Sequence, residues 1–325
     1  TIYERYTTQA FVTKNLLSTS FQLGKNHLDL STKVYYRDNN YDYKGSVHHK
    51  KLQLHFLPTY TILFGTDRTL SIELPIQWMK IGLNSQQTNN GNREIFSFSP
   101  SLYLKYKLTD KWKFVLSASM NRDNMAADFY SPYALRTAYR TVYFPNNEAF
   151  FNNSKNINTR FNYRNLATML FANLLVSYTD EKRENYINYN YTDSLTTISY
   201  IKGDNHQRLL VVDATVDKSF INAGVTLKSG LSYKKTSYLL SQSDILTYNN
   251  SNIFAVNLNV TYQKLKWLRA TIGVTGTVYW EHNDTYKSDA LSSLIADASV
   301  YIFPLKKLDI KHIDPNYTNE IIKSN

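Results

Sequence analysis

The sequence predicts an all-β protein, a transmembrane up-and-down antiparallel β-barrel with about fourteen strands in this chain. Three observations lead to this prediction. Apolar and polar residues alternate along extended stretches, no apolar run is long enough for a membrane-spanning helix, and short connections alternate with long polar ones.

The alternation is clearest between residues 254 and 280. Phe254, Val256 and the following even positions are mostly apolar, whereas Asn257 and its odd-numbered neighbours are mostly polar. After a turn at residues 264–266 the same parity resumes. Successive side chains of a strand point to opposite faces, so this stretch is predicted to be a hairpin with one apolar and one polar face.

The same pattern recurs along the chain, and each recurrence predicts further strands. A parity shift between Phe220 and Val225 indicates a bulge or an odd turn. The other apolar series with a single parity occupy residues 52–64, 70–78, 102–108, 114–120, 170–178 and 210–216.

The connections differ systematically in length. Short turns are predicted near residues 24–26, 65–67, 109–111, 165–168, 217–219, 264–266 and 304–306. Long polar stretches lie around residues 38–47, 84–93, 122–154, 180–206, 241–250 and 282–289. Outer-membrane barrels have short periplasmic turns and long extracellular loops, whereas a soluble sandwich has no reason to alternate in this way. Some strands, such as 170–188, exceed the length needed to cross and should project beyond the membrane.

The composition excludes several classes of protein. No cysteine is present among the 325 residues, which excludes disulfides and thiolate metal sites. The net charge of +11 comes from scattered Lys and Arg, so nucleic-acid binding is not favoured. The 27 tyrosines suit strands that end at a membrane interface. The expected location is therefore the bacterial outer membrane.

Aromatic residues cluster beside the short turns and are predicted to form a periplasmic-side girdle. The members of this predicted girdle are Phe64, Tyr106, Trp112, Phe171, Phe220, Tyr262, Trp267, Tyr301 and Phe303.

The segment NTRFNYRNLATMLFANLLVSYT, residues 158–179, resembles a strand-turn-strand element of the TonB-dependent outer-membrane receptors of the Bacteroidetes. The segments SPYALRTAYRTVYFPNN, LKYKLTDKWKFVLSASMNRD and LDIKHIDPNYTNEI resemble an extracellular loop, the preceding hairpin and a late strand of that family. Leu166 departs from the family, which commonly has proline there.

The resemblance implies a 22-stranded barrel closed by an N-terminal plug, which imports scarce nutrients with energy relayed from the inner membrane. Because about fourteen strands fall short of 22, residues 1–325 are expected to be a partial barrel domain from a longer protein. The implied partners are outer-membrane lipid, the plug of the same parent protein, an inner-membrane energy-coupling protein acting through the plug, and a surface lipoprotein. Two alternatives stay open: a complete smaller porin or channel, and a surface β-protein that acts as an adhesin or structural module.

No motif for catalysis or for a cofactor occurs in the sequence. HExxH, a glycine-rich phosphate loop and GxSxG are all absent, and the chain is therefore predicted not to be an enzyme. His48 and His49 are adjacent, so on a strand they point to opposite faces and cannot easily share a metal. The acidic residues Asp180, Glu181 and Glu184 are interpreted as part of a solvated loop.

Two sets of residues are candidates for ligand binding. The loop at 122–154 carries a basic-aromatic set able to stack on sugars or to clamp anionic groups: Tyr130, Tyr133, Arg136, Tyr139, Arg140 and Tyr143. Polar residues of odd parity are predicted to line the lumen, where they would solvate the inner wall and pair with the plug: Lys105, Lys107, Asp213, Asp217, Arg269 and Glu281.

Overall fold

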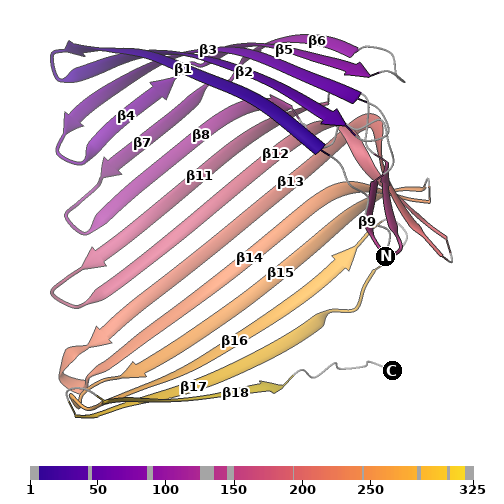
Figure 1. Cartoon of the computed structure of the whole chain (residues 1–325). Helices are drawn as coiled ribbons and strands as arrows, with labels where there is room; N and C mark the ends of the chain where they lie inside the picture. Colours follow the sequence, from indigo (N-terminus) through magenta and orange to yellow (C-terminus); the bar gives the residue numbers. More distant parts are fainter. Residues whose placement is uncertain are drawn as a thin grey trace.

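The computed structural model describes residues 7–42, 46–85, 91–124, 135–144, 150–192, 194–243, 245–283, 287–305 and 308–318. These residues form one curved sheet of 18 strands and a single short 3-10 helix (Figure 1). The all-β, up-and-down antiparallel prediction is confirmed. Among the described residues, no helix is long and apolar enough to cross a membrane.

The first part of the sheet contains two interrupted strands. β1 (Thr7–Leu23), β2 (Asn26–Asp42) and β3 (Ser46–Gly65) are continuous hairpin-connected strands. β4 (Arg68–Glu73) and β5 (Ile76–Ser85) both pair with β3 and act as one strand that is broken at Pro75. β6 (Gly91–Phe98) and β7 (Ser101–Lys107) are likewise separated at Pro100. Proline cannot donate to a ladder, which explains both breaks.

The remaining wall is formed by long strands that each pair antiparallel with the next. These are β8 (Trp112–Asn124), β11 (Phe151–Asn165), β12 (Leu170–Tyr191), β13 (Thr196–Phe220), β14 (Val225–Gln242), β15 (Ile245–Tyr262), β16 (Leu268–His282), β17 (Leu291–Leu305) and β18 (Leu308–Thr318). The short β9 (Leu135–Ala138) and β10 (Thr141–Phe144) lie between β8 and β11 in sequence and outside the wall. When each broken strand counts once, fourteen long strands make up the described wall, which agrees with the predicted number.

Register divides the wall into two faces. Lys105 pairs with Val115, Val115 with Arg160, and Arg160 with Leu175, so residues of this row share one face. Leu231, Val256 and Gly276 form a row on the opposite face. Apolar residues of the second face are exposed, with Leu231 51% and Ile272 59% accessible, because no second layer covers them among the described residues. We call this second face the apolar face.

The turn predicted at residues 217–219 is wrong. β13 continues to Phe220, and the chain turns through a 3-10 helix, η2 (Ile221–Ala223), and Gly224. Gly224 has φ 65°, and a Cβ there would lie 2.6 Å from the Cα of Lys264, so this turn requires glycine. The charged Lys218 is accommodated within the strand because its ammonium group reaches back to the Thr168 carbonyl, as snorkelling lysines do.

The stretch 180–206, expected to be a long loop, is instead almost entirely β structure. β12 and β13 have 22 and 25 residues and extend past the other strands as a hairpin (Figure 1). A bulge between Arg183 and Asn185 redirects the hairpin tip. The tip then pairs in parallel with the end of β14 at Asn188 and with β10 on its other side. This tip forms a small second layer over the long-loop end of the wall.

Candidate functional site

Two cavities lie against the face that carries Lys105 and Arg160. A cavity beside a single curved sheet is enclosed on the concave side, so this cavity-lining face is the inner face of the curve. One cavity, of about 780 Å³, lies at the short-turn end. The other, of about 540 Å³, lies at the long-loop end beneath the hairpin tip. Both fall within the size range of about 300–1,000 Å³ that is usual for ligand sites.

The cavity at the short-turn end is basic. Lys107, Lys113 and Arg160 line it together with Lys111 and Arg164, and two acidic residues, Asp67 and Asp110, also line it. Lys107 forms an ion pair with Asp110 at 2.8 Å, and Lys105 forms one with Asp67 at 2.9 Å. These hydrogen bonds lower the pKa values of the Asp67 and Asp110 carboxyls. The remaining positive charge makes this basic cavity complementary to anionic groups.

The cavity at the long-loop end, called the rim cavity, is lined mainly by amides, hydroxyls and aromatic rings. The wall contributes Asn152, Arg183, Asn205, Gln207, Thr236 and Tyr238. The hairpin tip and the end of β14 contribute Asn185, Tyr186, Ile187, Tyr189, Tyr200, Leu239 and Leu240. The cavity exists because the bulged hairpin folds back over the wall.

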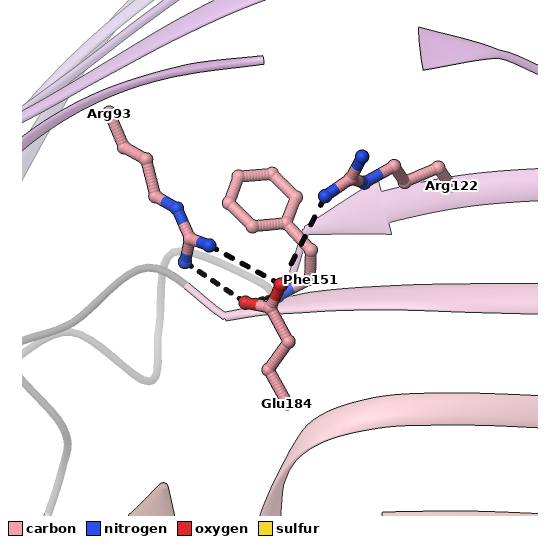
Figure 2. Close-up of polar contacts among 4 residues, drawn as sticks. All are labelled: Arg93, Arg122, Phe151 and Glu184. Carbon is pink, nitrogen blue, oxygen red and sulfur yellow. Dashed lines mark hydrogen bonds and ion pairs between the residues drawn. The ribbon is translucent and has the colours of Figure 1, made fainter. Parts of the chain in front are cut away.

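A cluster beside the rim cavity joins β6 to β8, β11 and β12, with which β6 shares no ladder among the described strands. Arg93 on β6 donates two hydrogen bonds to the Glu184 carboxylate, at 2.9 and 3.3 Å. Arg122 on β8 approaches the same carboxylate at 4.0 Å, and the Phe151 amide donates to it at 3.2 Å. Figure 2 shows the Phe151 ring between the two guanidinium groups, whose carbons lie 4.7 and 5.6 Å from the ring centroid. We call these four residues the Glu184 cluster.

The Glu184 cluster includes Phe151, which belongs to a cluster of buried apolar residues in the described part of the chain. Phe151 is 1% exposed and packs with Met79 and Ile81 of β5. β7 pairs with β8, whereas no ladder connects β6 to β8 among the described strands. Bidentate ion pairing and cation-π contact therefore hold the long-loop ends of β6, β8, β11 and β12 together.

The predicted basic-aromatic loop is only partly described. Tyr130 and Tyr133 lie outside the described residues, as does the side chain of Arg136. Tyr139 and Arg140 are exposed, and neither lines the basic cavity or the rim cavity. Tyr143 meets Tyr200 of the rim cavity edge-on, with ring centroids 5.8 Å apart. One predicted residue is thus attached to the rim cavity, although it does not line it.

The six residues predicted to line the lumen all have positions on the cavity-lining face by register, but they are dispersed over it. Lys107 lines the basic cavity. Asp213 accepts a hydrogen bond from Ser232, and Glu281 accepts bonds from the hydroxyls of Tyr238 and Tyr279. Lys105 forms an ion pair with Asp67. Asp217 and Arg269 lie opposite Phe171 and Tyr301 in their ladders. That these residues line a closed lumen stays a prediction.

The predicted girdle residues divide between the two faces. Tyr106, Trp112, Phe220 and Tyr262 occupy strand positions of the apolar face near the short turns, and Trp112 also borders the basic cavity. Phe64 lies at the register irregularity between Leu63 and Gly65, where no ladder partner fixes its face. Trp267 lies in a turn and is half exposed. Phe171 pairs with Arg164 and therefore shares the cavity-lining face. Tyr301 pairs with Arg269 and stacks on Phe303 at 6.5 Å, so these two rings also lie opposite the girdle.

Metal binding has no support in the described part of the chain, where no group of three or more His, Asp or Glu could hold an ion. The side chain of His48 lies outside the described residues. His49 is buried, and its burial together with the Arg37 cation lowers its pKa to about 4.

No protein-family model matches this chain, and no curated protein matches it either. The ferric-catecholate import receptor Fiu from Escherichia coli K12 matches with a TM-score of 0.55 and 12% identity, over 94% of this chain and 50% of that one. The siderophore receptor PirA from Pseudomonas aeruginosa gives 0.47 and 12%, over 98% and 62%. FpvAI in its complex with pyocin S2 gives 0.40 and 12%, over 85% and 46%.

The chain therefore spans from about half to under two thirds of the length of these solved structures. At such low identity, the match to Fiu concerns the fold alone. The curved antiparallel wall of this chain has the fold of a receptor barrel.

Proposed function

We propose that this chain is the barrel portion of a TonB-dependent outer-membrane transporter that imports a nutrient. The observation that carries the proposal is the uncovered apolar face of a single-layer sheet whose other face is polar. Residues 1–325 would then be part of the barrel domain of a longer protein, in the bacterial outer membrane.

The apolar face favours lipid over water. Phe254, Val256 and Leu258 are each more than a third exposed, and they continue across neighbouring strands as one surface. A soluble monomer rarely exposes an apolar surface larger than a few hundred Å². A surface adhesin would need a second layer over these side chains, whereas outer-membrane barrels place such a band against hydrocarbon.

The edges of the sheet support a partial barrel. Among the described strands, β1 pairs only with β2 and β18 pairs only with β17. Unpaired backbone groups cost several kcal/mol each in a bilayer, so further strands must complete the wall there. The resemblance of residues 158–179 to receptors of the Bacteroidetes makes strands of the parent protein the proposed occupants, in a 22-stranded barrel.

The basic cavity suits a plug. Its excess of lysine and arginine faces inward at the short-turn end, where a plug domain of the same parent protein would present acidic groups. The proposed partners are this plug, an inner-membrane energy-coupling protein that acts through it, outer-membrane lipid and a surface lipoprotein over the long-loop end.

Paired cysteine labelling tests the face assignment. The chain has no cysteine, so Val256→Cys and Asn257→Cys introduce single probes at adjacent positions of opposite faces. In native outer membranes, a water-soluble maleimide should label Asn257→Cys at least about tenfold faster than Val256→Cys, because hydrocarbon shields the latter. Equal labelling at both positions would refute the membrane assignment. Loss of uptake after deletion of the energy-coupling protein would then distinguish active transport from a passive porin.

A further inference from the structure

We propose that strands β5 and β6 form a flap in the wall, which can swing away from β8 and open a slot at the long-loop end. The flap consists of residues 76–85 and 91–98. It is weakly attached along the edge that faces the short turns, its free edge shares no ladder with β8, and a cluster of side chains closes it. Such a slot is independent of the solute that the transporter carries.

Three of the seven prolines form a line across the attachment of the flap to the rest of the wall. In each of three pairs of opposite residues on neighbouring strands, one partner is a proline: Pro58–Leu74, Pro75–Ser99 and Pro100–Met120. The amide of the partner donates to the proline carbonyl at 3.0, 3.1 and 2.9 Å respectively. Because proline has no N–H, the return bond that normally completes such an antiparallel pair cannot form.

This proline line is continuous from β3 to β8. Leu74 is bonded covalently to Pro75, and Ser99 to Pro100, so the three pairs follow one another directly. The flap lies on the long-loop side of the line, and β4 and β7 lie on the short-turn side (Figure 1). At each of three successive strand junctions, one of two hydrogen bonds is therefore missing at the same level. A sheet weakened in this way bends most easily along that line.

The free edge of the flap is the side of β6 that faces β8. On its other side the flap is held by a ladder of ten residue pairs, which extends from Val47 to Phe56 on β3. β7 pairs with β8 as far as Ser101, whereas β6 shares no ladder with β8 among the described strands. The β3–β5 ladder is therefore the axis about which the flap can turn.

The flap overlaps the ends of β8 and β11. Phe151 has the parity of the exposed Phe161, which lies on the apolar face of β11. Met79 and Ile81 have the parity opposite to the exposed Ile76, and so belong to the cavity-lining side of β5. Phe151 nevertheless packs against Met79 and Ile81, and all three are at most 3% exposed. This contact places the flap on the outer side of the end of the wall.

The Glu184 cluster closes the free edge of the flap. Arg93 on the flap donates two hydrogen bonds to Glu184 on β12, and Arg122 on β8 approaches the same carboxylate (Figure 2). Arg122 lies ten positions after Trp112, near the outer limit of the nine to eleven residues that cross a membrane. The three charged side chains are 27–42% exposed. Water and salt therefore reach the Glu184 cluster, and ion pairs of this kind can open and form again.

Distances between two spin labels test the flap. The chain has no cysteine, so labels within it attach only at introduced ones. In the full-length protein in lipid nanodiscs, the flap label at Phe96→Cys is combined with a wall label at Ile157→Cys on β11, both at exposed positions. Pulsed electron paramagnetic resonance measures their separation. Glu184→Gln should increase the population with the longer separation about fivefold, the factor that corresponds to the loss of one partly exposed bidentate pair.

Restoring the missing N–H groups tests the role of the proline line. Pro58→Ala, Pro75→Ala and Pro100→Ala together supply three donors for the ladders. Combined with Glu184→Gln, they should return the population with the longer separation to the level of the wild type, because the flap is then fixed along the edge that faces the short turns.

Two controls separate movement of the flap from general loosening of the wall. Glu94→Gln removes an ion pair with Lys80 that also lies on the flap, and should leave the distances unchanged. A label at Phe56→Cys on β3, combined with the same wall label, lies beside the axis and should not respond to Glu184→Gln. The flap would be overturned by an unchanged separation of the flap and wall labels in Glu184→Gln. An equal change from the β3 label, or no effect of the three alanines, would also overturn it.

Discussion

Adjacent residues of this wall should tolerate charge very differently, because parity alone decides whether a side chain meets lipid or the inner face. We predict that Val256→Arg and Val274→Arg each lower the free energy of unfolding in bilayers by about 2–4 kcal/mol if they lie near the midplane. Thr275→Arg and Asn257→Arg should be tolerated, since register places both on the cavity-lining face. Reversible urea unfolding in lipid vesicles measures all four. Equal losses for both pairs would contradict the assignment of faces.

His49 is expected to make the fold sensitive to acid. It lies sixteen residues from the turn at Gly65, beyond the nine to eleven residues that cross a membrane. Its pKa, lowered to about 4, means that the folded state resists a proton which the unfolded chain accepts below about pH 6.5. Stability should therefore fall as the pH falls from about 6.5 to about 4, and change little further below that from this group.

Replacement of His49 tests this dependence. At pH 5 the wild type should have lost about 2 kcal/mol relative to pH 8, and His49→Gln should lose correspondingly less. His206→Gln, at an exposed position, controls for the removal of a histidine. Unfolding curves at both pH values measure the difference. Identical pH profiles for wild type and His49→Gln would exclude His49 as the cause.

At the scale of elements, the Glu184 cluster should stabilise the long-loop end of the wall, where β6 and β8 separate. We predict that Glu184→Gln costs about 1–2 kcal/mol, because it removes a bidentate ion pair and weakens the acceptor for the Phe151 amide. This loss of stability is small because Arg93 and Glu184 are both partly exposed. Glu94→Gln removes a 2.7 Å pair with Lys80 that is about half exposed, and should cost under about 0.5 kcal/mol.

Hydrogen exchange locates the effect of the Glu184 cluster. Glu184→Gln should speed exchange at the long-loop ends of β6, β8 and β11, while the short-turn ends stay protected. A uniform increase along the strands would indicate global destabilisation and would contradict a local clamp.

Strands were predictable from this sequence because their signal is local. A period of two needs only a few residues to appear, and it located the long strands and most short turns. The turn at 217–219 was mispredicted because a polar Asp-Lys-Ser triplet is as suitable for a snorkelling strand end as for a turn. The face of Phe171, Tyr301 and Phe303 was missed because proximity to a turn does not determine parity; counting parity from Arg164 and Arg269 would have found it.

The candidate site was less predictable, because it depends on contacts between distant parts of the chain. The rim cavity needs a bulge at residues 183–185 and a hairpin tip that reaches β14, and neither has a distinctive local pattern. Tyr143 was singled out from the sequence for its aromatic and basic neighbours, yet its contact with Tyr200 joins residues 57 positions apart. The Glu184 cluster joins Arg93 to a residue 91 positions away, and was interpreted as solvated for the same reason.

At the scale of the whole molecule, the open edges separate the transporter from the porin. A complete fourteen-stranded porin requires β1 to pair with β18, but each has one neighbour among the described strands. If the missing neighbours are strands of the parent protein, residues 1–325 alone cannot close without strain. We predict that the isolated chain, refolded in planar bilayers, gives no reproducible unit conductance, because open edges must be satisfied by association with other copies. Cross-linking should then detect higher oligomers. Discrete, uniform conductance steps from a monomeric chain would favour the porin and contradict the partial barrel.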